Sequence, residues 1–373
     1  MKRIKVLFTI PNFDTAGSGK ALLNIAKGLD TDKFEAHIMC LHDKGPFFKV
    51  VESSGLPVHR YNYIPDARPV FRMFKECWQV SRYFKKINPD IIHSYNYSAN
   101  YTEALAARMA GIPWVFTKKN MNWGGKSKNG WKLRSLLAKK IAVQNKDMMA
   151  VFYNNRSKAI LIPRGVDVTY FQPTYPLGTE AILPGFPSSQ RLLICVANFV
   201  PVKGIEILIQ AFYKLNEKHI NWSLLLVGDD SNDYGKQLQN EVSKLKMTYR
   251  IKFSGKLLDV RPQLNRAEIF ILPTRGEGEG SPVALLEAMA SEKVVLGSNV
   301  PGIRDQLENF PDYLFEPSNI EDLANKLDNF MLEPKEYLKE IGLSFSSHVT
   351  ANYPIAKEIE KHELLYETII IRR

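Results

Sequence analysis

The stretch Leu272–Val295, LPTRGEGEGSPVALLEAMASEKVV, joins a glycine-rich loop to the start of a helix. Ser281 followed by Pro282 predicts a helix start, with the serine as N-cap and the proline at the first helical position. The glycines before it expose backbone N–H groups, and a helix N-terminus attracts phosphate. We therefore expect an anionic ligand at this loop.

Two carboxylates accompany the predicted helix start. Glu279 comes just before the cap, and Glu287 lies in the second turn on a face shared with small apolar residues. A carboxylate on such a face is costly to bury unless it accepts hydrogen bonds, which ligand hydroxyl groups would supply. Alternatively, Glu287 caps a neighbouring loop. Glu277 competes with Glu279 as the first carboxylate.

Outside this stretch, short apolar runs alternate with helix-length amphipathic segments. This alternation indicates parallel strands joined by crossover helices, and 373 residues exceed the usual size of a single core. We predict an α/β protein with two doubly wound, Rossmann-like domains that face each other across a cleft, where the carboxyl ends of the strands bind ligand. The predicted parts are an N-terminal domain at 1–168 with the helical tail 351–373, a linker at 169–190, and a C-terminal domain at 191–350.

The stretch Phe13–Leu29, FDTAGSGKALLNIAKGL, is similar to a phosphate-binding Walker loop but does not meet its requirements. The motif needs glycine where this chain has Asp14, and a hydroxyl side chain where it has Ala21. A P-loop ATPase or kinase is therefore not expected. What remains is a glycine turn between a strand and a helix, in which Gly17 and Gly19 allow a close approach of backbone to ligand.

The charge of the chain is unevenly divided. Residues 1–170 hold 28 Lys+Arg against 12 Asp+Glu, whereas residues 171–373 hold 22 against 27. The segment 123–140 contains six cations, two tryptophans and no acid, which favours an anionic membrane surface as its partner; a solvated helix face is the alternative. Nucleic acid is not expected, because no nucleic-acid-binding motif accompanies the charge.

Composition excludes several other classes of protein. Apolar and charged residues make up 45% and 24% of the chain, as in ordinary globular proteins. The three cysteines are scattered and lack partners at metal-ligand spacing, which favours free thiols and a cytoplasmic location. No apolar stretch approaches the roughly 18 to 20 residues of a membrane span. Since no Asp-x-Asp pair stands at a strand end, no metal is expected.

Several motifs resemble the retaining glycosyltransferases of family 4, which have the two-domain GT-B fold. The spacing of Glu279 and Glu287 within EGSPVALLEAMA is similar to the family signature, and further similar motifs occur in the family's order along nearly the whole chain. They are PDIIHSYNYSANYTEALAARMAGIPWVFT (89–117), IPRGVDVTYF (162–171), VANFVPVKGIEILIQAF (196–212), LLLVGDD (224–230) and RIKFSGKLLDVRPQLNRAEIFILPT (250–274).

The resemblance implies a site for a nucleotide diphosphate sugar, the donor. Lys203 and backbone N–H groups of the helix start would hold the two phosphates, Glu287 the ribose hydroxyls, and Glu279 the donor sugar. The glycine turn at Gly17 and Gly19 would close over the donor. The remaining donor-binding residues that the family implies are Asn198, Gly255, Lys256, Gly280, Ser281, Pro282 and Val283.

The chain departs from the family pattern at two positions. Asn198 stands where the family usually has an arginine that pairs with the diphosphate; Arg164 or Arg275 is a candidate to replace its charge. Lys119 stands where the family has a histidine of the first domain, and Lys119 or Asn120 is a candidate substitute. His93 ends a predicted strand at the cleft edge, either as a contact to substrate or as a satisfied structural side chain.

The resemblance implies transfer of a hexose-type sugar, with retention and without a metal cofactor, to a saccharide or lipid-linked saccharide. Bacterial surface polysaccharide synthesis at the inner face of the cytoplasmic membrane is the implied setting, with the enzyme cytoplasmic or peripheral. Two alternatives are a nucleotide-sugar 2-epimerase of the same fold and a non-catalytic sugar-nucleotide-binding protein.

Overall fold

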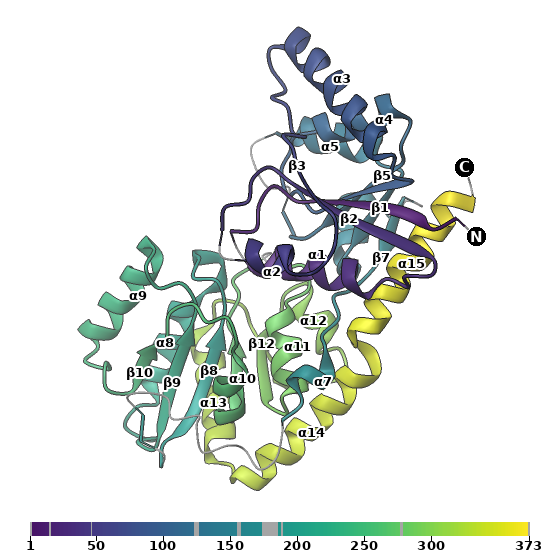
Figure 1. The fold of residues 1–373 in the computed structure, drawn as a ribbon. Helices are drawn as coiled ribbons and strands as arrows, with labels where there is room; N and C mark the ends of the chain where they lie inside the picture. Colours follow the sequence, from purple (N-terminus) through teal and green to yellow (C-terminus); the bar gives the residue numbers. More distant parts are fainter. Residues whose placement is uncertain are drawn as a thin grey trace. The chain divides into compact units, whose positions relative to one another are not determined.

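The computed structural model describes residues 2–14, 16–45, 47–122, 127–154, 158–173, 186–187, 189–276 and 279–371. The chain divides into an N-terminal domain, Met1–Pro163 with Ala356–Arg373, and a C-terminal domain, Arg164–Ile355. Each domain contains one parallel sheet flanked by helices (Figure 1). The prediction of two doubly wound α/β domains is confirmed.

The N-terminal sheet has the strand order β3-β2-β1-β4-β5-β6-β7. Its strands are β1 (Ile4–Thr9), β2 (Phe34–Cys40), β3 (Val58–Arg60), β4 (Ile91–Ser94), β5 (Trp114–Lys118), β6 (Lys140–Val143) and β7 (Ala159–Leu161). Its helices are α1 (Ala16–Gly28), α2 (Phe48–Glu52), α3 (Val70–Ile87), α4 (Thr102–Ala110), α5 (Lys128–Leu137), α6 (Lys146–Tyr153) and α15 (Ile355–Ile371).

The C-terminal sheet has the order β10-β9-β8-β11-β12-β13. Its strands are β8 (Arg191–Val196), β9 (Trp222–Val227), β10 (Ile251–Phe253), β11 (Ile269–Leu272), β12 (Val294–Ser298) and β13 (Leu314–Phe315). Its helices are α7 (Val168–Phe171), α8 (Ile205–Lys214), α9 (Asp233–Lys244), α10 (Arg261–Arg266), α11 (Val283–Ala290), α12 (Ile303–Gln306), α13 (Ile320–Leu332), α14 (Lys335–Asn352) and the 3₁₀ turns η1 (Pro201–Lys203) and η2 (Pro311–Tyr313).

Both sheets reverse their strand order at one internal pair. In the N-terminal sheet β1 pairs with β4, and in the C-terminal sheet β8 pairs with β11, where Ile269 lies opposite Leu193. The chain leaves the two strands of such a pair in opposite directions, so the loops at their carboxyl ends leave space for a ligand. Each domain therefore carries one candidate ligand edge.

The division between the domains differs from the predicted boundaries. The C-terminal domain begins at Arg164, before the predicted linker, because Val166 forms a bridge with Pro354 and Phe171 is buried in the second core. Residues 174–185 and 188 of that linker lie outside the described residues.

The last helix returns to the N-terminal domain, as predicted. Leu365, Tyr366 and Ile369 of α15 pack in the core formed by α1, β1 and β2. The structure also contains the strand β6, whose short apolar run begins at a lysine pair, and helix α6 after it.

Candidate active site

The loops after β8 and β11 bring Lys203 and Glu279 together. Lys203 ends the turn η1 after β8, and Glu279 lies in the loop between β11 and α11. Their ammonium and carboxylate groups form an ion pair with side chains that are only 18% and 8% exposed. The pair places a cation and an anion at the ligand edge of the C-terminal sheet.

The Glu279 carboxylate has a second partner. Thr274 donates its hydroxyl to Oε1 of Glu279 at 2.7 Å, and both side chains are buried. A buried carboxylate is tolerated when it is paired and hydrogen-bonded, and both conditions are met here. Glu279 is therefore held in one orientation by groups on two loops.

The start of α11 differs from the prediction at Ser281. The helix begins at Val283 with Pro282 as its N-cap, and the predicted capping role of Ser281 is wrong. Instead, the Ser281 hydroxyl oxygen accepts hydrogen bonds from Gln306 Nε2 at 2.9 Å and from the Arg164 backbone N–H at 3.3 Å. Because Pro282 has no capping side chain, it supplies no acceptor to the first-turn N–H groups.

Two glycines with positive φ allow these loops to pack closely. Gly204 has φ +60°, and a Cβ atom there would lie 2.2 Å from the carbonyl oxygen of Pro273. Gly302 has φ +81°, and its Cβ would lie 2.3 Å from the carbonyl oxygen of Gly280. Both positions require glycine, since any side chain would displace the loop that carries Glu279.

The two arginines proposed to replace the family's missing charge have different surroundings. Arg275 pairs with Glu206, which also accepts a hydrogen bond from the Tyr234 hydroxyl. Arg164 is 7% exposed and contacts the start of α11 through its backbone. Arg275 is the more accessible cation, with a side chain that is 49% exposed.

Other predicted donor-binding residues follow strands of the same sheet. Asn198 comes after β8, and its carbonyl accepts the N–H of Val200 at 2.9 Å. Gly255 follows β10 with φ +70° and accepts the N–H of Gly228 at 3.1 Å, while Lys256 beside it is exposed. Glu287 is partly exposed on α11. The competing Glu277 lies outside the described residues.

The glycine turn predicted in the N-terminal domain is helical. Gly17 and Gly19 belong to the first turn of α1, so the predicted loop conformation is wrong. A Cβ atom on Gly19 would lie 2.8 Å from the Phe13 ring and 3.2 Å from that of Phe47, which gives this glycine a packing role. Gly17 is exposed and has open space at its Cβ position.

Lys119 joins three elements at the ligand edge of the N-terminal sheet. It follows β5, and its ammonium donates to the Ser18 hydroxyl of α1 at 3.0 Å and to the Tyr95 carbonyl after β4 at 2.7 Å. Asn120 beside it is partly exposed, and its carbonyl accepts a hydrogen bond from Lys118 at 2.6 Å.

His93 is a structural residue in this fold. Its ring is fully buried in β4, with Nδ1 2.6 Å from the Tyr366 hydroxyl of α15 and Nε2 2.8 Å from the Thr117 hydroxyl of β5. The expected position at an accessible edge is wrong, and the alternative of a satisfied side chain is correct. Burial lowers the pKa of His93 to about 3.

A buried network that sequence reasoning missed lies beneath this edge. Glu103 of α4 accepts hydrogen bonds from Thr9 at 2.5 Å and Ser94 at 2.8 Å, at the ends of β1 and β4. Arg134 of α5 is fully buried and donates to the Asn96 carbonyl at 2.8 Å. Burial raises the pKa of Glu103, and nearby Arg134 opposes that rise.

The basic segment 123–140 has both buried and exposed side chains, and its contact with a membrane surface stays a prediction. Arg134 and Trp131 are buried, because α5 packs them against the N-terminal core. Trp123 and Lys126 lie outside the described residues. The predicted aromatic membrane contact cannot involve Trp131.

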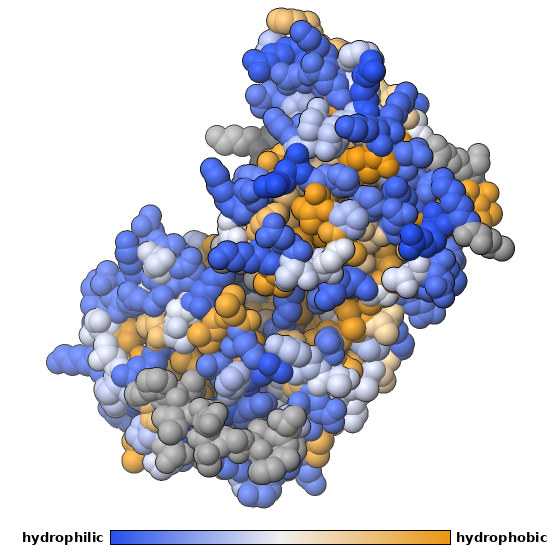
Figure 2. Space-filling model, in the orientation of Figure 1, coloured by the Kyte–Doolittle hydropathy of each residue, from blue (hydrophilic) through white to orange (hydrophobic). Residues whose placement is uncertain are grey.

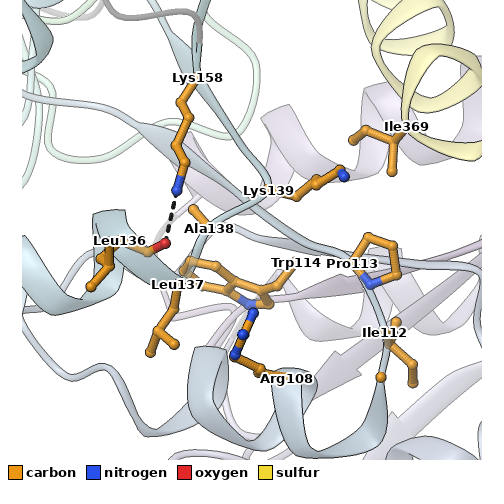
Figure 3. Close-up of a pocket in the computed structure, with 11 residues that line it drawn as sticks. Arg108, Ile112, Pro113, Trp114, Leu136, Leu137, Ala138, Lys139, Lys158 and Ile369 are labelled. Atoms are coloured by element: carbon orange, nitrogen blue, oxygen red, sulfur yellow. Dashed lines mark hydrogen bonds between the residues drawn. The ribbon is translucent and has the colours of Figure 1, made fainter. Parts of the chain in front are cut away.

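A pocket of about 380 Å³ lies elsewhere in the N-terminal domain (Figure 3). Pro113 and Trp114 at the amino end of β5 line it, with Lys139 just before β6. Lys158 donates to the Leu136 carbonyl at 2.8 Å, and burial together with Arg108 and Lys139 lowers its pKa. Because the pocket is at the amino ends of these strands, it is separate from the candidate ligand edge.

Two kinds of feature are absent from the described part of the chain. None of the helices there combines the length and apolar character needed to cross a membrane. In the same ranges, no group of three or more His, Cys, Asp or Glu side chains is arranged to hold a metal ion.

Both halves of the chain match models of known protein families. The model described as "Glycosyltransferase Family 4" matches residues 15–170, and that described as "Glycosyl transferases group 1" matches residues 183–342. The chain belongs to the family-4 glycosyltransferases of GT-B fold and is a glycosyltransferase.

Individual relatives agree with this assignment. The chain is 24% identical over 368 residues to the UDP-Gal:alpha-D-GlcNAc-diphosphoundecaprenol alpha-1,3-galactosyltransferase of Escherichia coli, covering 92% of each protein. A glycosyltransferase structure from Rickettsia africae ESF-5 has a TM-score of 0.86 at 21% identity and covers 99% of both chains. Anabaena Alr3699/HepE in complex with UDP and glucose has a TM-score of 0.83 at 19% identity, covering 98% of this chain and 100% of that one.

The structural role of His93 predicts a pH effect on stability. The folded state resists protonation of this ring, while the unfolded state takes up a proton below its ordinary pKa of 6.5. The contribution of the neutral His93 ring to the free energy of unfolding is thus fully present above pH 6.5 and is lost as the pH falls toward 3. Between pH 6.5 and 5 this loss is at most about 2 kcal/mol. Urea unfolding of His93→Gln should show a weaker loss over this range than the wild type. An equal loss in both proteins, or weaker nucleotide binding by the variant, would contradict the structural role.

Proposed function

We propose that this enzyme transfers a hexose-type sugar, with retention, from a nucleotide diphosphate sugar to a saccharide or lipid-linked saccharide in bacterial surface polysaccharide synthesis. The ion pair of Lys203 and Glu279 beside the start of α11 carries the proposal. A cation and a helix N-terminus suit a diphosphate, and a fixed carboxylate suits sugar hydroxyls. We propose a uridine diphosphate sugar as the donor, because the Escherichia coli relative is named as a UDP-Gal enzyme.

In the proposed reaction, an acceptor hydroxyl oxygen attacks the anomeric carbon from the face that the diphosphate leaves. The bond from that carbon to the phosphate oxygen breaks, and the hydroxyl proton passes to the departing diphosphate. Lys203 stabilises the negative charge that develops on the leaving group, while Glu279 orients the sugar. We propose that Lys203, Arg275 and the α11 N–H groups neutralise the diphosphate without a metal cofactor.

We propose that the acceptor binds to the N-terminal domain. The printed name of the Escherichia coli relative describes a diphosphoundecaprenol-linked acceptor, and this domain carries the excess of cations. Lys119 joins α1 to the ends of β4 and β5 there. We propose that Lys119, Asn120 and the exposed Gly17 backbone contact the transferred sugar or its acceptor.

A thermal-shift series tests the donor assignment. UDP, GDP, ADP and their sugar conjugates are added separately, since a ligand that binds only the folded state raises the melting temperature. We expect one nucleotide to give the largest shift, unchanged by EDTA. Slow hydrolysis of the matching nucleotide sugar without acceptor would distinguish an enzyme from a binding protein. No shift with any nucleotide would overturn the proposal.

We expect Lys203 and Glu279 to contribute to turnover as well as to stability. Lys203→Ala alone removes the cation that pairs with the buried Glu279, with a stability cost on the order of 3–5 kcal/mol. Lys203→Met combined with Glu279→Gln removes both charges, and we expect this variant to fold but to lose on the order of 10²- to 10³-fold in turnover. Lys214→Met is the matched control, because it removes an exposed ion pair with Glu321. Wild-type turnover in the double variant would remove both residues from the site.

Glu287 should act mainly on nucleotide affinity. A carboxylate that accepts ribose hydroxyls contributes on the order of 1.5–3 kcal/mol, so Glu287→Gln should weaken UDP binding by about 10- to 100-fold. Isothermal titration calorimetry measures the change, with Glu292→Gln as a control in the turn after α11. Equal affinity of Glu287→Gln and wild type would show that Glu287 has another role.

A further inference from the structure

Helix α3 has one face packed on the N-terminal domain. Met73, Cys77, Val80 and Phe84 are buried along it, at the spacing of a single helical stripe. This stripe gives α3 its attachment to the core that also contains residues of α4. The helix therefore packs on the domain mainly through this stripe.

A second apolar stripe lies on the opposite, outward side of α3. Phe71, Phe74 and Trp78 are separated by three and four residues, which places them on one face. Their exposed fractions are 80%, 51% and 51%, and Val70 beside them is 57% exposed. Large apolar side chains gathered in this way mark a surface that another phase or molecule covers. Figure 2 shows a hydrophobic group at the outer end of the largely hydrophilic region over α3.

Cations continue the outward stripe. Helix α3 holds five Lys and Arg residues and one acid, Glu76, which pairs with Arg72. Arg82 and Lys85 follow Trp78 at helical spacing on the same face, and the Arg82 guanidinium lies 5.1 Å from the centre of a Trp78 ring. The outward face thus combines aromatic rings in its first half with positive charge in its second half.

We propose that the outward face of α3 docks this enzyme on the surface of an anionic phospholipid bilayer. The aromatic rings would enter the interfacial region while the lysines and arginines contact lipid phosphates, as in amphipathic helices that lie in a membrane surface. A second copy of the chain is a poorer partner, since pairing α3 with itself would bring like charges together. The inference rests on the proposed function, in which the acceptor is lipid-linked.

Vesicle flotation with the full chain tests the docking surface. The probes are vesicles of phosphatidylcholine alone and of phosphatidylcholine with phosphatidylglycerol, at low salt. We expect binding only to the anionic vesicles, and at least tenfold weaker binding for Phe71→Ser/Phe74→Ser and for Arg82→Glu/Lys85→Glu. Tyr249→Ser/Leu258→Ser is the control, because these C-terminal-domain side chains are 62% and 88% exposed. No flotation of the wild type, or equal flotation of all variants, would overturn the proposal.

Trp78 gives a local signal for the same contact. Trp114, Trp131 and Trp222 are at most 2% exposed, so brominated lipid should quench Trp78 in preference to them. We expect anionic brominated vesicles to quench wild-type fluorescence and to quench Trp78→Phe at most half as much. Equal quenching of both proteins would mean that α3 does not enter the lipid.

The outcomes separate this inference from the proposed function. Nucleotide binding and donor hydrolysis are measured on the same α3 variants, which leave Lys203 and Glu287 unchanged. Retained donor chemistry without vesicle binding refutes the docking surface alone, whereas vesicle binding without any nucleotide effect refutes the proposed function. If Phe71→Ser/Phe74→Ser instead abolishes self-association in sedimentation velocity, the face covers a second copy and the membrane proposal fails.

Discussion

The parallel pairing of β8 with β11 determines the geometry of the candidate site in the C-terminal domain. These strands are neighbours in the sheet but are separated in sequence by β9 and β10, so their following loops diverge at the carboxyl edge. One loop carries Lys203 and the other carries Thr274 and Glu279. The ion pair forms because the pairing of β8 with β11 brings both loops to the same edge of the sheet. Gly204 and Gly302 allow these loops to pack closely against neighbouring backbone.

Sequence reasoning predicted the two sheets and the return of α15, whereas the donor-binding roles of individual residues stay predictions. These features depend on local patterns: apolar alternation for the strands, and the spacing of Glu279 and Glu287 for the family. The partnership of Lys203 with Glu279, and the bonds of Ser281 to Gln306 and Arg164, depend on contacts between distant segments. No local pattern encodes such contacts. The sequence alone therefore predicts for Ser281 the role of N-cap, which is common for a serine before a helix.

The sequence alone also could not show which basic segment exposes its aromatic side chains. Counting charges correctly assigned the cationic half of the chain, but it placed the aromatic contact in 123–140, where Trp131 and Arg134 are buried. The sequence does contain a signal that distinguishes α3 from this segment. The 18 residues of α3 include more large apolar side chains than one buried stripe requires. The excess forms a second stripe, and only solvent exposure shows that this stripe has no protein covering it among the described residues.

The return of α15 makes the C-terminal domain an insertion within the N-terminal one. Residues 164–355 contain every strand of the second sheet in one continuous stretch, whereas the N-terminal core needs Leu365, Tyr366 and Ile369. During synthesis from the N-terminus, the inserted domain is complete while the first domain still lacks a wall of its core. The domain made first can thus complete its core only after α15 has left the ribosome, when His93 meets its Tyr366 partner.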